Sequence, residues 1–136
     1  LDGEPILVYG DGEQTRAFSD IDYYMEPFHQ LINDHDEEIF NIGADKHWSL
    51  NEVAEIVRKT GEKYGYPNTI EHAEARLEVK DAYCNHDKAK NSLSFKDETN
   101  LESLVDKMFN WAKDQPERES KMMNYEIDKG IYSYWK

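Results

Sequence analysis

The chain has 136 residues, enough for one domain with a hydrophobic core, and 33% of them are charged. The net charge of −13 argues against nucleic acid as a partner, and it means that a few placed cations must build any phosphate site. No apolar run reaches the roughly 20 residues that span a bilayer, so we expect no membrane contact. No secretion leader is visible and the single cysteine excludes an internal disulfide, so we expect a cytoplasmic protein.

The first predicted element is a buried strand over Ile6–Tyr9, which two glycines bring to an end. Gly10 and Gly12 lack side chains and therefore allow the backbone to come close to a ligand. Arg16 follows, one of four arginines in the chain, and its planar guanidinium suits a phosphate group. Strand, glycine turn and arginine together predict a wall for a flat, anionic ligand.

A helix is predicted next, after residues 19–22, which are rich in side chains that cap helices. Apolar residues recur with the spacing of one helical face, at Ile21, Tyr24, Met25, Phe28, Leu31 and Ile32. Pro27 lies inside this pattern and should either kink the helix or restart it from the first turn. We expect residues 33–38 to form a solvated acidic loop and residues 39–43 to form a second buried strand.

The helix signal is clearest after residue 48, where Ser49 and Glu52 form a capping box. One helical face follows, made by Val53, Ala54, Ile56, Val57, Thr60 and Tyr64. Gly65 and Pro67 should end this helix.

Short elements are predicted for the following part of the chain. Residues 69–71 and 82–84 read as short strands on either side of a charged loop over residues 74–81. A short helix should run over residues 85–93. Two to four short strands make a poor sheet by themselves, so we expect that some of them pair with strands outside this chain.

A second capping box is predicted over residues 99–102, at the start of another helix. Its apolar stripe consists of Leu101, Leu104, Val105, Met108 and Ala112. Pro116 lies just past its end, and a tail follows that is polar at first and then aromatic. The chain begins at Leu1 without a methionine, close to a strand, so we expect a fragment or a processed product.

The order of these segments resembles the C-terminal part of extended short-chain dehydrogenases/reductases of the nucleotide-sugar epimerase/dehydratase family, best known from UDP-glucose 4-epimerase. The segments that carry the resemblance are residues 8–18, 21–22, 40–43, 49–54 and 87–90. The resemblance implies an α/β fold, helix-rich with a few short strands, that lacks the N-terminal Rossmann core. The glycine-rich NAD loop of that core is not found in this sequence, and Tyr-x-x-x-Lys does not occur in the setting that the family gives its catalytic pair.

The resemblance also implies a division of labour within the parent enzyme. Residues 1–115 would form the nucleotide-sugar-binding region, with residues 20–43 packed on the Rossmann core, and residues 116–136 would form a C-terminal tail. NAD in the parent takes hydride from the sugar and returns it to the other face. This chain alone would hold no NAD, contain no catalytic residue and be inactive.

The family's nucleotide-contacting residues fall on seven positions of this chain, Leu7, Val8, Tyr9, Arg16, Phe18, Arg76 and Glu78. The strand over residues 7–9 corresponds to the one that contacts uracil, and Arg16 to the arginine that binds pyrophosphate. Arg76 and Glu78 correspond to a later arginine and acid that hold phosphate and ribose. The family places that arginine three residues before the acid, where Ala75 stands here. Ser94 likewise stands where a helix-ending glycine is usual.

Three other readings come from the residues themselves. Arg16 could be a surface arginine that pairs with acids. A metal site is not expected, because Cys84 and His86 lack the further ligands that zinc needs. The chain could also be a non-catalytic acidic module that forms a homo-oligomer through apolar surfaces at residues 21–31 and 39–43. Within the family, the alternative reaction is that of a nucleotide-sugar dehydratase.

Overall fold

The computed structural model describes residues 4–34 and 38–116. The elements in chain order are β1 (Ile6–Tyr9), β2 (Thr15–Ala17), the 3₁₀-helix η1 (Ile21–Tyr24), α1 (Met25–Asp34), β3 (His47–Ser49), α2 (Leu50–Lys63), β4 (Ile70–Ala73), β5 (Asp81–Ala82), α3 (Asp87–Ser92) and α4 (Leu101–Ala112). This α/β composition, helix-rich with short strands, agrees with the expected fold class. None of the helices within the described residues is long and apolar enough to cross a bilayer.

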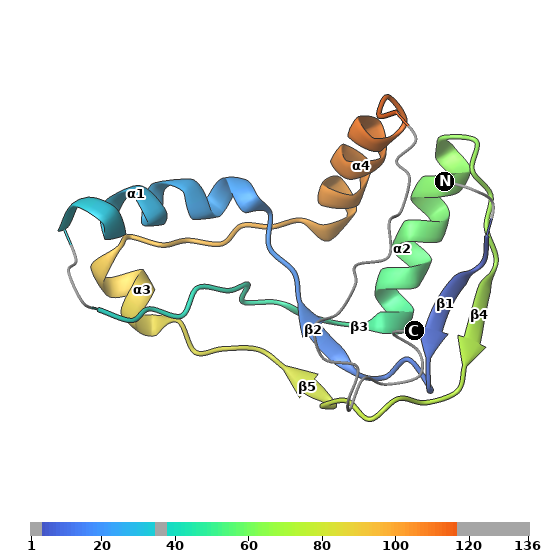
Figure 1. Ribbon diagram of the computed structural model, residues 1–136, viewed down its shortest axis with the longest axis horizontal. Coiled ribbons are helices and arrows are strands. Elements are labelled where there is room, and N and C mark those ends of the chain that lie inside the picture. Colours follow the sequence, from blue (N-terminus) through green and yellow to red (C-terminus); the bar gives the residue numbers. More distant parts are fainter. Residues whose placement is uncertain (1–3, 35–37, 117–136) are drawn as a thin grey trace, which may run out of the picture.

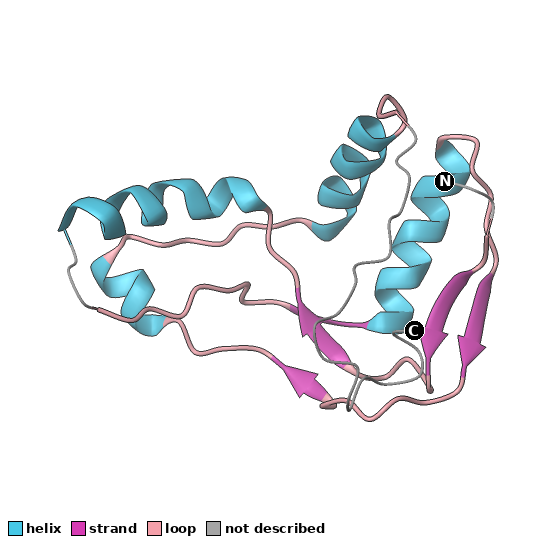
Figure 2. Ribbon diagram, viewed as in Figure 1, coloured by secondary structure: helices cyan, strands magenta, loops and turns pink. Residues whose placement is uncertain are grey.

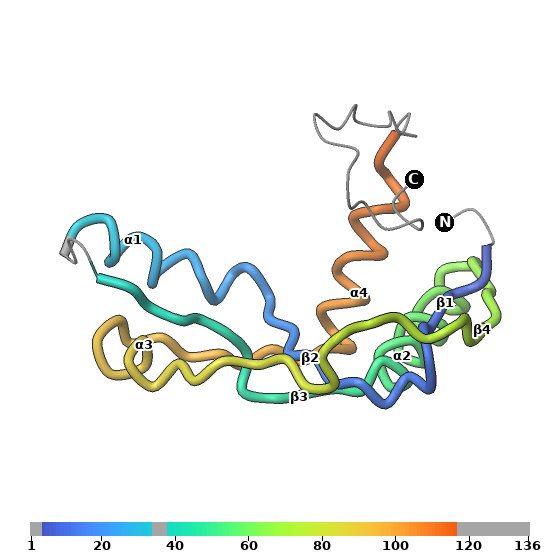
Figure 3. The backbone as a smooth tube through the Cα atoms, turned by 60° about the horizontal axis from the view of Figure 1, so that its bottom comes forward, coloured from blue at the N-terminus to red at the C-terminus, as the bar shows by residue number. Residues whose placement is uncertain are grey.

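The molecule is elongated, with two ends joined by short strands (Figures 1 and 2). Helices α1 and α3 lie at one end, and α2 with the pair β1–β4 lies at the other. The turned view of Figure 3 shows the same separation, with α4 rising between the two ends. Strands β2, β3 and β5 connect the ends, so the candidate site residues that follow β1 lie beside this connection.

Two small sheets fix the relative positions of distant segments. Strand β1 runs parallel to β4, from Ile6 opposite Ile70 to Tyr9 opposite Ala73. In the second sheet, β2 lies between β3 and β5, antiparallel to the first and parallel to the second. Strands β2 and β3 were not expected, because each has only three residues and lacks an apolar run. Such strands are specified by their partners rather than by their own sequence.

The helix signals after residue 48 are confirmed. The Ser49 hydroxyl accepts a hydrogen bond from the Glu52 N–H, and the Ser49 N–H donates to the Glu52 carboxylate. Gly61 is buried where α2 meets α4. A Cβ at this position would lie 2.8 Å from the Tyr66 carbonyl oxygen and 3.4 Å from the Phe109 ring, so a larger residue would not fit without a shift. Helix α2 ends as expected, with a glycine after its C-cap.

A hydrophobic cluster holds together the end of the molecule that carries α1 and α3. Leu93 and Ala89 are fully buried and Phe95 nearly so. Partly buried side chains pack against this cluster from η1, α1 and the segment after α1, namely Tyr23, Leu31, Phe40 and Ile42. Helix α3 is therefore the element on which α1 and residues 40–42 rest.

Two expectations for local structure are wrong. No strand forms over residues 39–43, because no strand among the described residues pairs with this segment. Ile39 is 85% exposed, and Phe40 and Ile42 pack against the α3 cluster instead. The cap of α4 is Asn100, whose side chain accepts from the Ser103 N–H, rather than Thr99. The Thr99 hydroxyl instead accepts a hydrogen bond from the Asp20 N–H at 2.8 Å.

Other expectations are resolved or lie outside the described residues. Pro27 lies in the first turn of α1. Of the two expected outcomes, a kink or a restart of the helix, the structure therefore shows the restart. Helix α1 extends to Asp34, into the segment expected as an acidic loop, and residues 35–37 lie outside the description. The predicted tail also lies outside it from residue 117 onward.

Replacing Ser94 by glycine should raise the free energy of unfolding by about 1 kcal/mol. Ser94 follows α3 with a φ of +49°, a left-handed conformation that costs an L-residue about 1–2 kcal/mol and glycine little. Urea unfolding followed by circular dichroism measures the change. Ser92→Gly, inside α3, is the control and should destabilise the chain. A Ser94→Gly variant that is no more stable than wild type would contradict the prediction.

The link between η1 and α4 should weaken in acid. The Asp20 carboxylate accepts from the Asp22 N–H and from the Lys107 ammonium, and these bonds lower its pKa from the ordinary value of an aspartate. Because the folded-state pKa is the lower one, the contribution of Asp20 to stability is present above about pH 4 and is lost as the pH falls through the folded value. The stability difference between wild type and Asp20→Asn should therefore shrink below pH 4 in urea unfolding. A difference that stays constant from pH 6 to pH 3 would contradict this.

Candidate functional site

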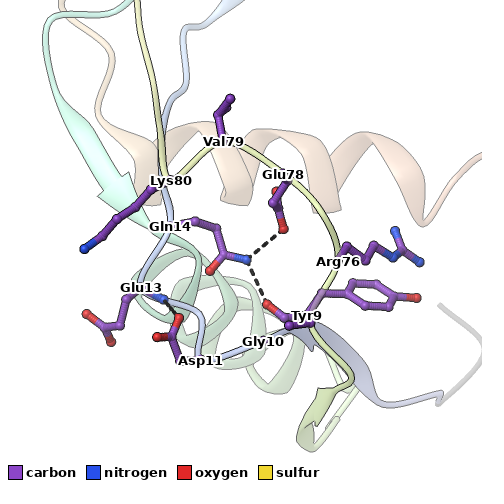
Figure 4. Close-up of a pocket in the computed structure, with 10 residues that line it drawn as sticks. Tyr9, Gly10, Asp11, Glu13, Gln14, Arg76, Glu78, Val79 and Lys80 are labelled. Atoms are coloured by element: carbon purple, nitrogen blue, oxygen red, sulfur yellow. Dashed lines mark hydrogen bonds between the residues drawn. The ribbon is translucent and has the colours of Figure 1, made fainter.

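A cavity of about 350 Å³ opens where β1 ends. Its walls are two segments far apart in sequence, which the parallel pairing of β1 with β4 brings to the same edge (Figure 4). The lining residues are Tyr9, Gly10, Asp11, Glu13, Gln14, Ala75, Arg76, Glu78, Val79 and Lys80. A crevice at the carboxyl ends of parallel strands is where open α/β sheets commonly bind ligands.

The glycine turn forms the floor of this cavity. Gly10 and Gly12 have φ values of +72° and +75°, and a Cβ on Gly12 would overlap the Asn51 side chain. The Asn51 amide donates to the Asp11 carbonyl and the Glu13 carboxylate, each at 2.9 Å. The turn is therefore fastened to the first turn of α2, and residue 12 must be glycine for this approach.

Arg16 lies on β2, directly behind the cavity wall. Its guanidinium donates to the Glu78 carboxylate at 2.5 Å, to the Thr15 carbonyl at 2.7 Å and to the Lys80 carbonyl at 3.2 Å. The parallel pairing of β2 with β5 brings Arg16 to the loop that carries Glu78. Arg16 is thus an arginine paired with an acid, and this acid lines the cavity.

Gln14 is a central residue of the wall that the sequence did not single out. Its side-chain amide donates to the Tyr9 carbonyl at 2.8 Å and to Glu78 Oε1 at 3.1 Å, and only 8% of the residue is exposed. Figure 4 shows this amide between the two acceptors. A polar residue between a glycine turn and Arg16 is the only sequence signal, and it does not indicate burial.

Arg76 lies at the rim of the cavity, in spite of its changed spacing. Its guanidinium carbon lies over the Tyr9 ring, 3.2 Å from the ring centroid, in a cation–π arrangement (Figure 4). The structure therefore brings Tyr9, Arg76 and Glu78 together around the cavity, with Arg16 behind them.

The remaining three predicted site residues lie elsewhere. Val8 is buried in the core, with 3% exposed, and Leu7 points to the opposite face of β1, with 51% exposed. Phe18 lines a different hollow of about 730 Å³ between η1 and α4, with Met108 and Trp111. A contact of Phe18 with the ligand of the first cavity would need a ligand that extends past β2.

Cations gather at the cavity, as we expected for a phosphate site in a chain with a net charge of −13. Arg76 and Lys80 line it and Arg16 lies behind it, against the acids Asp11, Glu13 and Glu78. The ratio of cations to acids is therefore three to three at the cavity, whereas the whole chain has 16 basic and 29 acidic residues. This balance suits a ligand that has both anionic groups and hydrogen-bond donors.

The histidine and cysteine that were weighed as a metal pair do not act together. His86 is buried and its Nε2 bonds to Asp45 at 2.8 Å, while Cys84 Sγ lies against Gly43. Lys90 and His86 lower the pKa of Asp45 through their hydrogen bonds to its carboxylate. Among residues 4–34 and 38–116, no three His, Cys, Asp or Glu side chains gather as a metal site would require.

Comparison with known proteins finds that the chain is similar to part of several nucleotide-sugar enzymes. No protein-family model matches it. It is 29% identical over 115 residues to UDP-glucuronate 4-epimerase of Thermodesulfobacterium geofontis, over 84% of this chain and 35% of that protein. It is 31% identical over 112 residues to GDP-mannose 3,5-epimerase of Arabidopsis thaliana, over 82% of this chain and 29% of that protein. The chain therefore spans about a third of the length of these relatives.

The solved structures show the same fold. UDP-glucose 4-epimerase of Thermotoga maritima, solved with UDP-glucose, matches with a TM-score of 0.69 and 22% identity, over 82% of this chain and 37% of that one. Two structures of a Bacillus cereus UDP-glucuronic acid 4-epimerase also match, and both hold NAD with a UDP-linked sugar. The fold of the chain is therefore that of part of these enzymes.

Proposed function

Because this chain is related to part of the extended short-chain dehydrogenases/reductases that act as nucleotide-sugar epimerases and dehydratases, we propose that it is the C-terminal, substrate-binding part of an NAD-dependent epimerase that acts on a UDP-sugar, most similar to UDP-glucose 4-epimerase. The observation that carries the proposal is the cavity at the end of β1, where Arg16 is held by Glu78 and Arg76 lies at the rim. The resemblance implies that Arg16 stands at the family's pyrophosphate-binding position, and that Arg76, one residue from the usual position, and Glu78 hold phosphate and ribose.

Each residue of the site has a binding role in this proposal. Arg16 and Arg76 bind the diphosphate by charge-assisted hydrogen bonds, and Glu78 accepts a hydrogen bond from a ribose hydroxyl. The backbone of β1 contacts the base. These contacts are remote from the reacting carbon of the sugar, and their binding energy orients the sugar for the reaction.

NAD does not fit the described residues of this chain. In a dinucleotide fold the glycine-rich turn joins a strand to a helix, and the pyrophosphate binds at the N-terminus of that helix. Here the turn at Gly10 and Gly12 leads into β2, a strand. We therefore assign hydride transfer to the rest of the parent enzyme and expect this chain alone to be inactive.

Isothermal titration calorimetry with UDP, UDP-glucose and dTDP-glucose tests the proposal. UDP and UDP-glucose should bind the folded chain, and uridine, which lacks the diphosphate, should bind more weakly by tenfold or more. A preference for dTDP-glucose would instead favour a dehydratase, since a dTDP-glucose 4,6-dehydratase is among the solved structures with this fold. A folded chain that binds none of the three contradicts the proposal.

Exposed apolar side chains on η1 and α1 support a second role, in assembly. Met25, Phe28 and Ile32 of α1 are 52%, 44% and 81% exposed, Ile21 of η1 is 60% exposed, and Ile39, which follows α1, is 85% exposed. Exposed apolar surface, where it is contiguous, marks an interface. We propose that the N-terminal Rossmann part covers these side chains in the parent enzyme, and that the chain alone forms a homo-oligomer through them.

The chain alone should therefore elute as an oligomer in size-exclusion chromatography with light scattering. Ile32→Glu should shift it to the monomer, because a buried, unpaired carboxylate opposes association. Leu77→Glu is the matched control, since Leu77 is 96% exposed on the loop after β4, away from α1. A wild-type monomer, or equal effects of the two variants, would contradict the assembly role.

A further inference from the structure

The Glu78 carboxylate divides its two oxygens between two donors. Oε2 accepts from the Arg16 guanidinium at 2.5 Å, and Oε1 accepts from the Gln14 amide at 3.1 Å. Arg16 is therefore already bound to an anion of the protein itself. A phosphate that takes the bond which Arg16 now makes to Glu78 displaces this carboxylate.

We propose that Glu78 is an internal counter-anion that makes Arg16 selective for a diphosphate that carries a ribose, over free pyrophosphate. The proposal rests on the function proposed above and adds to it a reason for discrimination between two anions of similar charge. Gln14 is the positioning residue that keeps Glu78 in the cavity when Arg16 leaves it.

The selectivity follows from what Glu78 gains or loses. Free pyrophosphate would take the guanidinium from Glu78 and bring no ribose hydroxyl in return, so that one more anion would face Glu78, Asp11 and Glu13. A nucleoside diphosphate takes the same guanidinium but brings ribose hydroxyls, which can donate to the released oxygen. The exchange of partners is then complete, and no acceptor is left unpaired.

Gln14 is built to stay in place during this exchange. It is nearly buried, and its amide is fastened to the Tyr9 carbonyl at 2.8 Å as well as to Glu78 (Figure 4). Because the Tyr9 carbonyl belongs to β1, this contact does not depend on Arg16. Loss of the amide should let Glu78 follow Arg16 or turn into solvent, and the ribose hydroxyl would lose its acceptor.

The test compares UDP with pyrophosphate in calorimetric titrations of the full chain. Glu78→Gln keeps the size of the side chain and removes its charge, so pyrophosphate should bind about tenfold more tightly while UDP gains less or binds more weakly. The preference for UDP over pyrophosphate should fall at least tenfold. Glu13→Gln removes an equal charge from the same cavity without touching Arg16, and it should change both affinities alike.

Gln14→Met is the second variant, close in size but without the amide. It should weaken UDP by about tenfold and leave pyrophosphate unchanged or tighter, a split that general unfolding would not produce. If the wild-type chain binds UDP, but Glu78→Gln and Glu13→Gln change the affinities for UDP and for pyrophosphate by the same factor, the counter-anion role of Glu78 is wrong and the proposed function still stands. A folded wild-type chain that binds no UDP would overturn the proposed function and this inference together.

Discussion

Replacing Arg16 by alanine is expected to weaken UDP binding about 100-fold, the largest effect of any single change at the proposed site. A charge-assisted hydrogen bond contributes roughly 1.5–3 kcal/mol, and 1.4 kcal/mol corresponds to a tenfold change in affinity. The guanidinium would be lost, and of its two donors among the described residues Glu78 would keep the Gln14 amide. Isothermal titration calorimetry with UDP measures the loss, and circular dichroism checks that the variant is folded.

Arg58→Ala is the matched control for this experiment. Arg58 lies on α2 and pairs with Glu55 at 2.8 Å and Glu62 at 3.3 Å, and it lowers the pKa of Glu55 to about 2. Its removal changes the net charge as much as the removal of Arg16 but leaves the cavity intact. Equal UDP affinities of the two variants would show that Arg16 does not bind the phosphate.

Replacing Leu93 by alanine should lower the free energy of unfolding by about 3 kcal/mol, the largest expected effect on stability. Truncation of a buried leucine costs about 2–5 kcal/mol, because the lost contacts and the cavity left behind add together. Leu93 is fully buried between Ala89 and Phe95, and α1 packs on this cluster through Leu31. The change is a large fraction of the 5–15 kcal/mol that stabilises a typical domain.

Urea unfolding followed by circular dichroism measures this loss, with Leu77→Ala as the control. Leu77 is 96% exposed, so its truncation should change stability by less than about 0.5 kcal/mol. The cluster lies at the α1–α3 end of the molecule, away from the β1 end (Figure 1). UDP affinity of the folded Leu93→Ala variant should therefore be retained. A loss of stability equal to that of Leu77→Ala would show that the cluster does not hold this end together.

The helices were predictable because their signals are local. Ser49 and Glu52 lie three residues apart and cap each other, so that the sequence alone specifies where α2 begins. Gly65, with a φ of +84°, marks its end in the same way. The short strands carry no such signal, and the segment over residues 39–43 looks like a strand but pairs with no other strand among the described residues.

The site was predictable only in part. The resemblance selected Arg16, Arg76 and Glu78 without indicating their geometry, and the structure places them at one cavity or directly behind it. The position of Gln14 could not be predicted, because its burial depends on β1 and on the loop before β5. Phe18 was assigned to the same ligand, but it lines the hollow between η1 and α4.

By itself, the sequence determined the amphipathic helices, the glycine turn after β1 and the need for locally placed cations in an acidic chain. Only the tertiary structure decided that β2 pairs with β5, that Asn100 rather than Thr99 caps α4, and that Arg16 is held by Glu78. The physical reason is the range of the interactions. Helix caps and turns use neighbours within a few residues. In contrast, the pairing of β2 with β5, the hydrogen bond of the Asp20 N–H to Thr99 and the Arg16–Glu78 ion pair join residues more than 60 positions apart.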